Sequence, residues 1–390
     1  MRVAVLCDFA EERWPSMDLI PEMLLSAISS AGSPCLHCSR IQPVMRHRIQ
    51  LFAKGTTARN ADRLVARLFD YPRFARHLIG RFDVFHLIDH SYSQLVHCLP
   101  GGRTVVTCHD TDTFRCILDP ARDRRPFWFR AMAWHILKGL EKAAFIACAS
   151  ETTRSALLRH GIAAPEKSAV VYNGVDSSFS PEANEYDDEL DAILGPRAAS
   201  VDLLHVGSTI PRKRIDILLR VFAQCLRSNS DLRLIRIGGL FTADQARLCR
   251  ELGIYDFIRV LPHLSRNLLA AAYRRAAVVL LTSESEGFGL PVAEASACGV
   301  PVVASDLPAL REAGGTVCAY VAPANVEDFA ERVLCLLEER ASYPAVSAAR
   351  RTAAVRHAAK FSWSQYARSM AAIWSSVAGV TQFDLEPHVL

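Results

Sequence analysis

Short apolar runs without a polar face alternate with longer helical patterns along most of the chain, and this alternation constrains the fold most strongly. A first series of such runs covers 3–9, 84–89, 104–110, 145–150 and 169–174. A second series covers 202–207, 232–238, 258–262, 277–283, 301–306 and 319–323. Strands of this kind are typical of parallel sheets that are covered by helices on both faces. We therefore predict an α/β fold with two Rossmann-like, doubly wound parallel-sheet domains that face a cleft.

The length and the local composition suggest where the domains begin and end. The chain has 390 residues, which is more than one hydrophobic core usually supports. The segment 176–200 is rich in acidic residues, Ser and Pro, and we predict that it links domains at 1–175 and 201–361. The remaining segment, 362–390, begins with a Ser-capped helical pattern that is expected to pack back toward the N-terminal domain. Its apolar stripe is expected to serve packing, not a cofactor, and consists of Trp363, Tyr366, Met370 and Trp374.

Composition favours a cytoplasmic protein. No apolar run approaches the roughly 18 residues of a membrane span, and the first residues lack the pattern of a signal peptide. The 12 cysteines lie mostly in apolar strand-like or helix-like segments, which fits free thiols in a reducing compartment.

A basic segment runs from Arg40 to Arg81. It holds ten Arg or Lys against two Asp, a local charge of +8. One interpretation is a solvated helical face, and another is peripheral docking on an anionic membrane surface, such as the cytoplasmic face of the inner membrane, or on a phosphorylated lipid acceptor. Nucleic acid is not expected as a partner, because neither an aromatic-rich RNA platform nor a zinc-finger pattern accompanies the charge.

Two glutamates bracket a glycine turn in "SESEGFGLPVAEASACGVPVVASD", residues 283–306. Gly289 lets the backbone turn tightly, and Pro291 suits the first turn of a helix whose free amides can face an anion. Glu294 lies one turn inside this helix, where its carboxylate could accept hydrogen bonds from a ribose diol, and Glu286 precedes the turn. Taken alone, Glu294 could simply be an acidic residue favoured by the helix dipole, and Glu286 a charged loop residue. The two glutamates together with the glycine turn favour a ligand-binding site.

Two cations follow the first strand of the second series. In "DLLHVGSTIPRKR" we predict a helix from about Pro211, with Arg212 and Lys213 in its first turn. Cations at a helix N-terminus oppose the macrodipole, so this placement suggests that an anion binds nearby, with a solvated pair as the alternative. In doubly wound sheets the carboxyl ends of the strands are where ligands bind.

The motif "EGFGLPVAE", together with "ACGVPVVASD", resembles the E-x7-E motif of the retaining glycosyltransferases of family 4 (glycosyl transferases group 1), and the chain is expected to be bacterial. "HVGSTIPRKRIDILL" is similar to the donor-phosphate loop of that family, and "VVYNGVD", "TVVTCHD" and "IRVLPHLSRNLLAAAYRRA" also match its pattern. The resemblance covers nearly the whole chain. It implies the GT-B fold, with an acceptor-binding N-terminal domain and a C-terminal domain that binds the nucleotide sugar.

Residue by residue, the resemblance implies that Glu294 holds the ribose hydroxyls and that Arg212 and Lys213 hold the diphosphate. Glu286 and His109 would contact the transferred sugar, and with Arg212 and Lys213 they form the expected catalytic set. The remaining donor-binding residues that it implies are Gly207, Ser208, Phe288, Gly289 and Leu290.

The chain departs from the family pattern at two places. Ser208 stands where many members have Arg, and "FAEERWPSMD" replaces the usual glycine-rich loop after the first strand. Because this loop differs, the acceptor site is less well defined, and Asp8 and Asp110 are its candidates.

The implied activity is transfer of a sugar, such as mannose or glucose, from a UDP-, GDP- or ADP-sugar to a glycan or lipid-linked acceptor in polysaccharide or glycolipid synthesis. The anomeric configuration would be retained, and front-face attack is favoured over a covalent intermediate. No Asp-x-Asp signature stands in a suitable loop, so we expect no metal and no other cofactor.

Two alternatives remain at this point. A sugar-nucleotide 2-epimerase shares the GT-B fold, and a non-catalytic sugar-nucleotide sensor or partner subunit would need the same donor-binding residues. A dinucleotide dehydrogenase is disfavoured, because no G-x-G-x-x-G follows the first strand.

Overall fold

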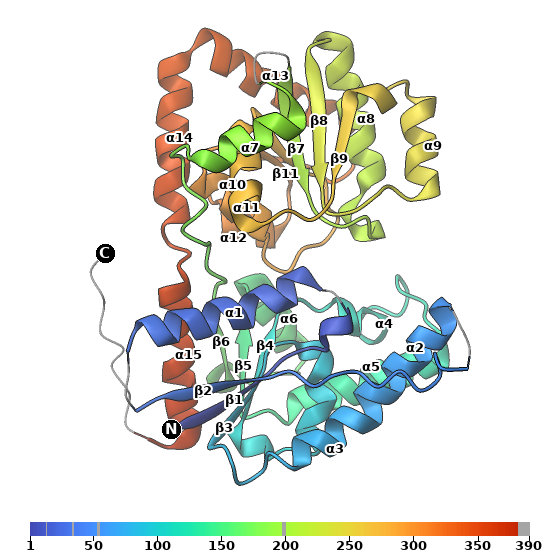
Figure 1. Cartoon of the computed structure of the whole chain (residues 1–390), viewed down its shortest axis with the longest axis vertical. Helices are drawn as coiled ribbons and strands as arrows, with labels where there is room; N and C mark the ends of the chain where they lie inside the picture. The colour runs from blue at the N-terminus through green and yellow to red at the C-terminus, as the bar shows by residue number, and fades with distance from the viewer. Residues whose placement is uncertain (13, 33–34, 53–54, 197–199, 381–390) are drawn as a thin grey trace. The chain divides into compact units, whose positions relative to one another are not determined.

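The computed structural model describes residues 1–12, 14–32, 35–52, 55–196 and 200–380 (Figure 1). The chain divides into two compact units, and each is built around its own parallel sheet. The first unit contains Met1–Gly174 and the chain from Trp363 onward, and the second contains Val175–Ser362. Lys54 in the basic segment, residues 197–199 of the predicted linker and the tail from 381 lie outside the described residues.

The first unit has a six-stranded parallel sheet in the order β2-β1-β3-β4-β5-β6. Five strands fall where apolar runs predict them, and most of their residues are buried because helices cover both faces of the sheet. The exception is β2, a partly exposed edge strand whose polar sequence HCSRI gives no apolar run. The strands are β1 (Arg2–Leu6), β2 (His37–Ile41), β3 (Val84–Leu87), β4 (Thr104–Cys108), β5 (Phe145–Cys148) and β6 (Ser168–Val170).

Two groups of helices form the layers of this unit. On one face, α1 (Pro15–Ser30) packs with α15 (Trp363–Ala378) in a common core. On the other face, one continuous core joins η2 (Ala66–Asp70), α3 (Tyr71–Arg76) and α5 (Phe127–Glu141) to the sheet. Helix α2 (Thr56–Val65) leads directly into η2, which is its π-helical extension. The shorter elements are η1 (Ala10–Glu12), η3 (His90–His97), η4 (Gly101–Arg103), η5 (Asp112–Phe114), α4 (Arg115–Leu118), α6 (Glu151–Arg159) and η6 (Pro165–Lys167).

The last helix, α15, belongs to the first unit although it follows the second in sequence. All four members of its predicted apolar stripe are buried, and Trp374 is 0% exposed. The ring of Trp374 lies edge-on to that of His86 on β3, with 5.5 Å between ring centroids. The stripe therefore serves packing, and α15 covers one face of the sheet.

The second unit has a six-stranded parallel sheet in the order β12-β11-β10-β7-β8-β9. Its strands match the second series of apolar runs, so the predicted fold class is confirmed for both units. These strands are β7 (Val201–Val206), β8 (Leu232–Ile237), β9 (Ile258–Leu261), β10 (Val278–Leu281), β11 (Val302–Ser305) and β12 (Ala319–Val321).

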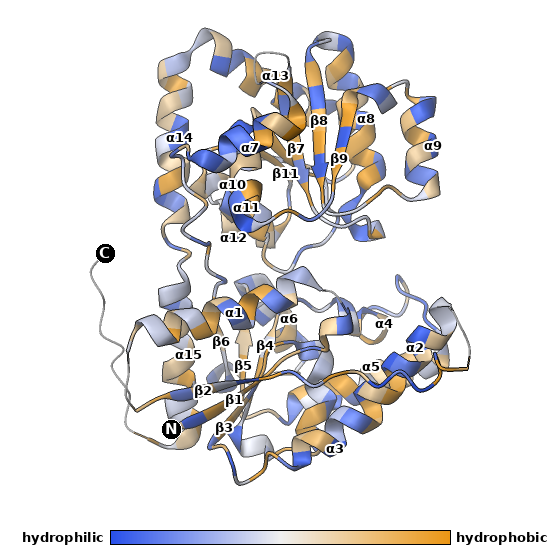
Figure 2. Cartoon of the chain, in the orientation of Figure 1, coloured by the Kyte–Doolittle hydropathy of each residue, from blue (hydrophilic) through white to orange (hydrophobic). Residues whose placement is uncertain are grey.

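Helices cover both faces of the second sheet, and Figure 2 shows most of them as mixtures of hydrophobic and hydrophilic residues, as expected where one side faces the core. They are α7 (Glu185–Leu194), η8 (Pro211–Lys213), α8 (Ile215–Ser228), α9 (Ala243–Glu251), η9 (Tyr255–Phe257), α10 (Arg266–Arg275), α11 (Leu290–Ala297), α12 (Pro308–Gly314), α13 (Val326–Ser342) and α14 (Pro344–Ala358).

The segment 176–200, expected to be a linker, carries helix α7 and is part of the second unit. Asn184 caps this helix, and Asp187 completes a capping box with it. Two of the acidic residues that suggest a linker, Asp187 and Asp191, are instead partners of the buried Arg274 and Arg275. Asp187 pairs with Arg274 at 2.6 Å, and the guanidinium side chain is only 3% exposed.

Candidate active site

The candidate site lies at the carboxyl edge of the second sheet, where the strand order reverses. Strands β7 and β10 are neighbours, and the chain proceeds from them toward opposite edges. Such a switch point is where open α/β sheets bind ligands, because the loops after the two strands diverge. The two predicted motifs follow these strands directly: 207–214 follows β7, and 282–289 follows β10.

The two cations stand in the turn before a helix, not in its first turn. Arg212 and Lys213 belong to the short 3-10 turn η8, and α8 begins only at Ile215. Arg214, which lies between η8 and α8, adopts a left-handed backbone conformation (φ 47°). This conformation is strained for a residue with a side chain, and it redirects the chain. The prediction of a helix from about Pro211 is therefore wrong by one turn.

Contacts from the β10 loop fix this turn in place. The hydroxyl of Thr282 donates to the carbonyls of Lys213 and Arg214, at 3.2 Å and 3.1 Å. The amide of Glu284 donates to the carbonyl of Arg212 at 2.8 Å. The backbone that carries the cations is thus held against the loop that carries the first glutamate.

Glu286 joins the two cations into one cluster. Its Oε1 accepts from Lys213 Nζ at 2.5 Å and from Ser283 Oγ at 2.6 Å, and its Oε2 accepts from Arg212 Nη1 at 3.2 Å. Burial alone would raise the pKa of Glu286, but attraction to Lys213 and then Arg212 outweighs it and lowers the pKa below its ordinary value. The carboxylate is therefore ionised between two cations.

A helix N-terminus lies beside this cluster in sequence and at the same sheet edge. As predicted, α11 begins at Leu290, and its N-cap Gly289 has φ 99°, which favours glycine. A β-carbon at Gly289 would also stand 2.5 Å from Leu310 Cδ2. Phe288 is buried and packs edge-on against Phe361, with 5.3 Å between centroids, which anchors the turn.

The second glutamate of the motif, Glu294, has a different environment. It lies in α11, is 6% exposed, and accepts a hydrogen bond from the hydroxyl of Tyr273 at 2.8 Å. Burial raises the pKa of Glu294 to about 7, against the hydrogen bond from Tyr273, and the charge of Asp176 adds to the rise. Thus one glutamate is fixed in its ionised form, and the other titrates near neutral pH.

Gly207 ends the β7 strand next to Lys213. A β-carbon at Gly207 would lie 3.3 Å from the His205 ring and 3.7 Å from Lys213 Cε, so the missing side chain leaves room for the lysine. The carbonyl of Gly207 accepts from Arg236 Nη2 at 2.9 Å. Ser208, the departure from the family pattern, follows directly and is partly exposed.

The first unit has its own switch point, between β1 and β3. Asp8 follows β1 and is 5% exposed, and its pKa lies well above its ordinary value because of burial and then the neighbouring carboxylate of Asp89. Asp110 follows β4, with Oδ1 3.6 Å from His90 Nε2 and in a hydrogen bond from the Asp112 amide. The acceptor candidates Asp8 and Asp110 therefore both lie at the carboxyl edge of this sheet.

His109 also lies at this edge, directly after β4. Its Nε2 is 2.7 Å from the carbonyl of Ile88, so this nitrogen carries the proton and Nδ1 is the acceptor. Burial lowers the pKa of His109, although Asp89 opposes the shift, so the ring is neutral at physiological pH.

Sequence reasoning missed several partners of these residues. Tyr273 stands within the quoted stretch "LLAAAYRRA", but its spacing of 21 residues from Glu294 gives no local signal. Ser283 opens the glutamate motif and is recognisable only once its contact with Glu286 is known. In the first unit, Glu12 is buried between Arg63 at 2.7 Å and Arg67 at 3.7 Å, a pairing that needs the folded sheet.

Comparisons with known proteins identify the relatives of this chain. The family model "Glycosyltransferase Family 4" matches residues 40–179, and the model "Glycosyl transferases group 1" matches residues 200–339. D-inositol 3-phosphate glycosyltransferase 1 of Catenulispora acidiphila is 34% identical over 226 residues, which cover 55% of this chain and 53% of the relative. The enzyme named D-inositol 3-phosphate glycosyltransferase in Geodermatophilus obscurus is 34% identical over 57% of this chain and 50% of the relative. The chain thus aligns with about half the length of these curated relatives.

Solved structures share the fold over almost the whole chain. Sucrose-phosphate synthase from Thermosynechococcus elongatus superimposes with a TM-score of 0.75 at 17% identity, covering 97% of this chain and 99% of that one. Anabaena HepE in complex with UDP-glucose gives a TM-score of 0.70 at 17% identity, covering 96% of this chain and 100% of that one. WaaG, a glycosyltransferase involved in lipopolysaccharide biosynthesis, gives 0.67 at 16% identity, covering 98% and 100%. These likenesses and the two parallel sheets establish the predicted GT-B fold.

Proposed function

Because this chain belongs to glycosyltransferase family 4, we propose that it is a retaining enzyme that moves a hexose from a nucleoside-diphosphate sugar to a glycan or lipid-linked acceptor. One observation carries the proposal. Lys213, Arg212 and Glu286 meet at the switch point of the second unit, where two cations face one carboxylate and a net positive charge remains. A diphosphate suits that charge.

Most of the donor would be bound by groups of the second unit. Lys213 and Arg212 pair with the diphosphate, and the N-terminus of α11 at Leu290 adds amide dipoles that favour an anion. Glu294 accepts from the ribose hydroxyls, and its bond from Tyr273 orients the carboxylate. Gly207 and Ser208 border the phosphates, and the turn at Phe288 and Gly289 brings the backbone close to the sugar.

Catalysis in this proposal rests on the leaving group. The diphosphate gains negative charge as the glycosidic bond breaks, and cations that are already in place stabilise that charge without reorganising. Glu286 holds Lys213 in position and accepts from hydroxyls of the transferred sugar, and neutral His109 is a further sugar contact. The departing phosphate oxygen takes the proton of the attacking hydroxyl, so the new bond forms on the same face. Arg212 and Lys213 supply the positive charge, and we propose that no metal ion is needed.

The names of related proteins suggest which substrates to test first. HepE has been solved with UDP-glucose, so UDP-glucose is the first donor, followed by GDP-mannose and an ADP-sugar. Relatives named for D-inositol 3-phosphate suggest a phosphorylated polyol as one acceptor, and WaaG suggests a lipid-linked glycan as the other. Asp8 and Asp110 are proposed to contact the acceptor.

A peripheral position at the cytoplasmic face of the inner membrane is part of the proposal, and the basic segment 40–81 would contribute to it. Within the described residues no helix is long and apolar enough to cross a bilayer. Several arginines of the segment have acidic partners, among them Arg48 with Asp70 and Arg63 with Glu12. Among the described residues of this segment, ion pairs are formed by Arg40, Arg48, Arg63 and Arg67 and not by Arg46, Arg59, Arg73, Arg76 or Arg81.

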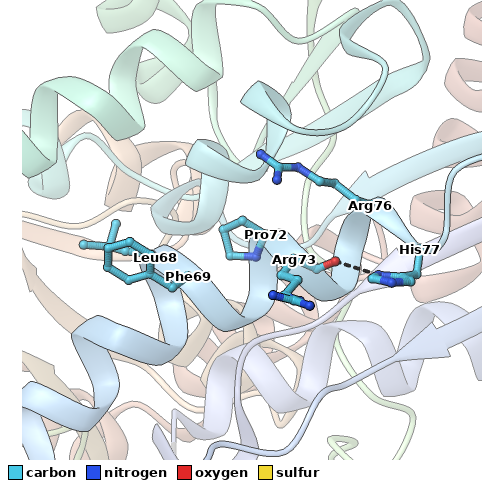
Figure 3. A pocket seen from close by; sticks show the side chains of 6 residues that line it. All are labelled: Leu68, Phe69, Pro72, Arg73, Arg76 and His77. Carbon is cyan, nitrogen blue, oxygen red and sulfur yellow. Dashed lines mark hydrogen bonds between the residues drawn. The ribbon is translucent and has the colours of Figure 1, made fainter.

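Two of these arginines border an apolar hollow on η2 and α3. The hollow has a volume of about 580 Å³ (Figure 3). Its lining combines aromatic and aliphatic side chains with cations, and consists of Leu68, Phe69, Pro72, Arg73, Arg76 and His77. An anionic lipid headgroup would fit the cationic part of this lining, and the first methylene groups of the lipid would fit its apolar part.

The proposed function is tested with the donor panel. Thermal-shift screening should identify one nucleotide sugar, since a ligand at 100 times its Kd stabilises the folded state by about 2.7 kcal/mol. With that donor, the chain should release nucleoside diphosphate slowly without acceptor and rapidly with it, and NMR of the product should show a retained anomeric configuration. Donor binding without any turnover would indicate a sensor, and formation of a free epimeric sugar would indicate an epimerase.

A further inference from the structure

Helix α5 buries one apolar side and, within the described residues, exposes three aromatic rings on its other side, beside Arg130 and the Lys138–Glu141 ion pair. Its inward residues Ala133, Ile136, Leu137 and Leu140 are buried in the core of the first unit. On the other side, the side chains of Phe127, Trp128 and Trp134 are 84%, 60% and 54% exposed. A helix at the surface of a globular protein normally presents charged and polar residues there. Among the described residues, Lys138 lies over one of these rings, that of Trp134, and the three rings stay largely exposed.

Cations are interleaved with these aromatic rings. Helical spacing places Arg130 between Phe127 and Trp134 on one face, and Arg124 and Arg125 immediately precede the helix. Arg125 pairs with Asp123 and stacks on Phe129, whereas Arg124 and Arg130 have no ion-paired acid among the described residues. Cations at a helix N-terminus are unfavourable on their own, which suggests that an anion offsets them.

The layer that contains α5 exposes further aromatic and arginine side chains. Helices η2, α3 and α5 share one core cluster, so they cover the same face of the sheet (Figure 1). The exposed side chain of Phe69, at 68%, and the hollow with Arg73 and Arg76 lie on this layer. Large exposed apolar side chains and unpaired arginines thus recur over its outer surface.

This combination fits a bilayer interface better than a protein partner. Trp and Phe rings partition to headgroup depth, and arginine guanidiniums reach lipid phosphates beside them. A two-fold contact with a second copy through this face would place the Arg124 and Arg130 side chains of both copies in one interface, and the cores of protein interfaces are depleted of charged residues.

We propose that the outer face of α5, with Phe127, Trp128 and Trp134 as the inserted side chains and Arg124 and Arg130 as the phosphate contacts, docks on an anionic phospholipid bilayer. The helix lies in the plane of the interface, and its aromatic rings reach the boundary between headgroups and acyl chains. This proposal names the surface that anchors the enzyme, and it does not rest on the identity of the sugar or the acceptor.

The test uses the full chain with vesicles of phosphatidylglycerol and phosphatidylcholine, and with pure phosphatidylcholine as the neutral control. The parent should bind anionic vesicles, and lipids brominated near the headgroup should quench its tryptophan fluorescence. The triple variant Phe127→Ser, Trp128→Ser, Trp134→Ser should lower the partition coefficient on the order of 100-fold, because three large apolar side chains no longer leave water. Arg124→Glu with Arg130→Glu should abolish binding to anionic vesicles.

Matched variants in the second unit control for surface and charge. Leu240→Ser with Tyr343→Ser removes side chains that are 81% and 60% exposed, and Arg332→Glu with Arg356→Glu makes the same change in charge. Both should bind vesicles like the parent. Unchanged binding by the triple serine variant would overturn the proposal, as would a parent dimer that this variant dissociates. Turnover of a water-soluble acceptor without lipid should be equal in all variants, so a failure of the proposed function would be seen separately.

Discussion

Lys213 Nζ lies 2.5 Å from Glu286 Oε1, although the two residues are 73 positions apart in sequence. Their strands, β7 and β10, are neighbours at the point where the sheet order reverses, so the loops after them meet. The lysine proposed for the diphosphate is therefore positioned by the carboxylate proposed for the sugar. A ligand that displaces part of this ion pair would bind to a lysine that is already oriented, which reduces the ordering that binding requires.

The first prediction concerns that lysine. Lys213→Ala should lower kcat by about 100- to 1000-fold and weaken donor binding, because the cation matters most when the diphosphate gains charge. Arg212→Ala should have a smaller effect, since Arg212 Nη1 also donates to the Ser285 carbonyl at 2.9 Å. Steady-state kinetics measure both. Arg214→Ala is the control, because its ion pairs are with Asp216 and Glu284. A Lys213→Ala enzyme within a few-fold of the parent in kcat would remove Lys213 from the mechanism.

The second prediction is a pH dependence of donor binding. The pKa of Glu294 is raised to about 7, and the ionised carboxylate is the better acceptor for ribose hydroxyls. Affinity for the nucleotide sugar should therefore rise as the pH passes upward through about 7 and fall below it. Because the pKa of Glu294 is ordinarily 4.5, the folded state binds more protons than the unfolded state between pH 4.5 and about pH 7. The contribution of Glu294 to the stability of the fold therefore falls as the pH rises through this range.

Isothermal calorimetry with the intact nucleotide sugar checks this prediction, since its diphosphate does not titrate near neutral pH. Glu294→Gln should bind more weakly, by on the order of 1.5–3 kcal/mol, with a flat profile between pH 6 and 8. A profile with the same midpoint in parent and variant would assign the titration to another group.

The third prediction concerns Tyr273 as a positioning residue. Tyr273→Phe removes the hydrogen bond that favours the Glu294 carboxylate, so the midpoint of the pH profile should move upward by about one unit or more. Tyr320→Phe is a matched control in the same unit, because its hydroxyl donates to the backbone carbonyls of Leu310 and Gly315. A midpoint that stays in place while affinity falls would indicate a packing role only.

The fourth prediction separates structural arginines from docking arginines in the segment 40–81. Arg63→Glu should destabilise the fold, because Glu12, whose side chain is 1% exposed, would face a like charge. Arg73→Glu with Arg76→Glu should leave the melting temperature near that of the parent and weaken binding to anionic vesicles, more so at low salt. Equal vesicle binding by the double variant would assign these two arginines to a solvated surface.

The fifth prediction is a loss of stability in the first unit. Trp374→Ala should cost about 3–5 kcal/mol of unfolding free energy, because a fully buried ring is removed from the core beside His86. Urea denaturation monitored by circular dichroism measures the change. Trp14→Ala, at a site that is 43% exposed, should cost much less, and equal effects would contradict the packing described for α15.

Much of the fold follows from the sequence because parallel strands are buried on both faces and show as uninterrupted apolar runs. The edge strand β2 cannot be predicted in this way, because its sequence HCSRI is polar and partly exposed. Helix α7 is also not predicted, for another reason. Its acidic residues are typical of a linker, and only the folded structure shows that Asp187 pairs with Arg274, 87 positions away.

In the candidate site, too, features that depend on residues close in sequence can be predicted, and contacts between distant residues cannot. The glycine turn, the helix start at Leu290 and the identities of Lys213 and Glu286 are local and predictable. The triad that Glu286 makes with both cations depends on two strands being neighbours, and the helix boundary near Pro211 depends on the left-handed Arg214. The opposite pKa shifts of the two motif glutamates follow from their burial and their partners, and the sequence between them does not contain that information.

Helix α15 has a consequence for how the chain is made. The second unit is continuous from Val175 to Ser362, so all of its residues have been synthesised before α15 is translated. The first unit, although translated first, leaves the apolar face of α1 and β3 uncovered until residues 363–378 emerge from the ribosome. Synthesis therefore completes the later unit before the earlier one, and a chain released after Ser362 would have a complete second unit and an open, aggregation-prone first unit.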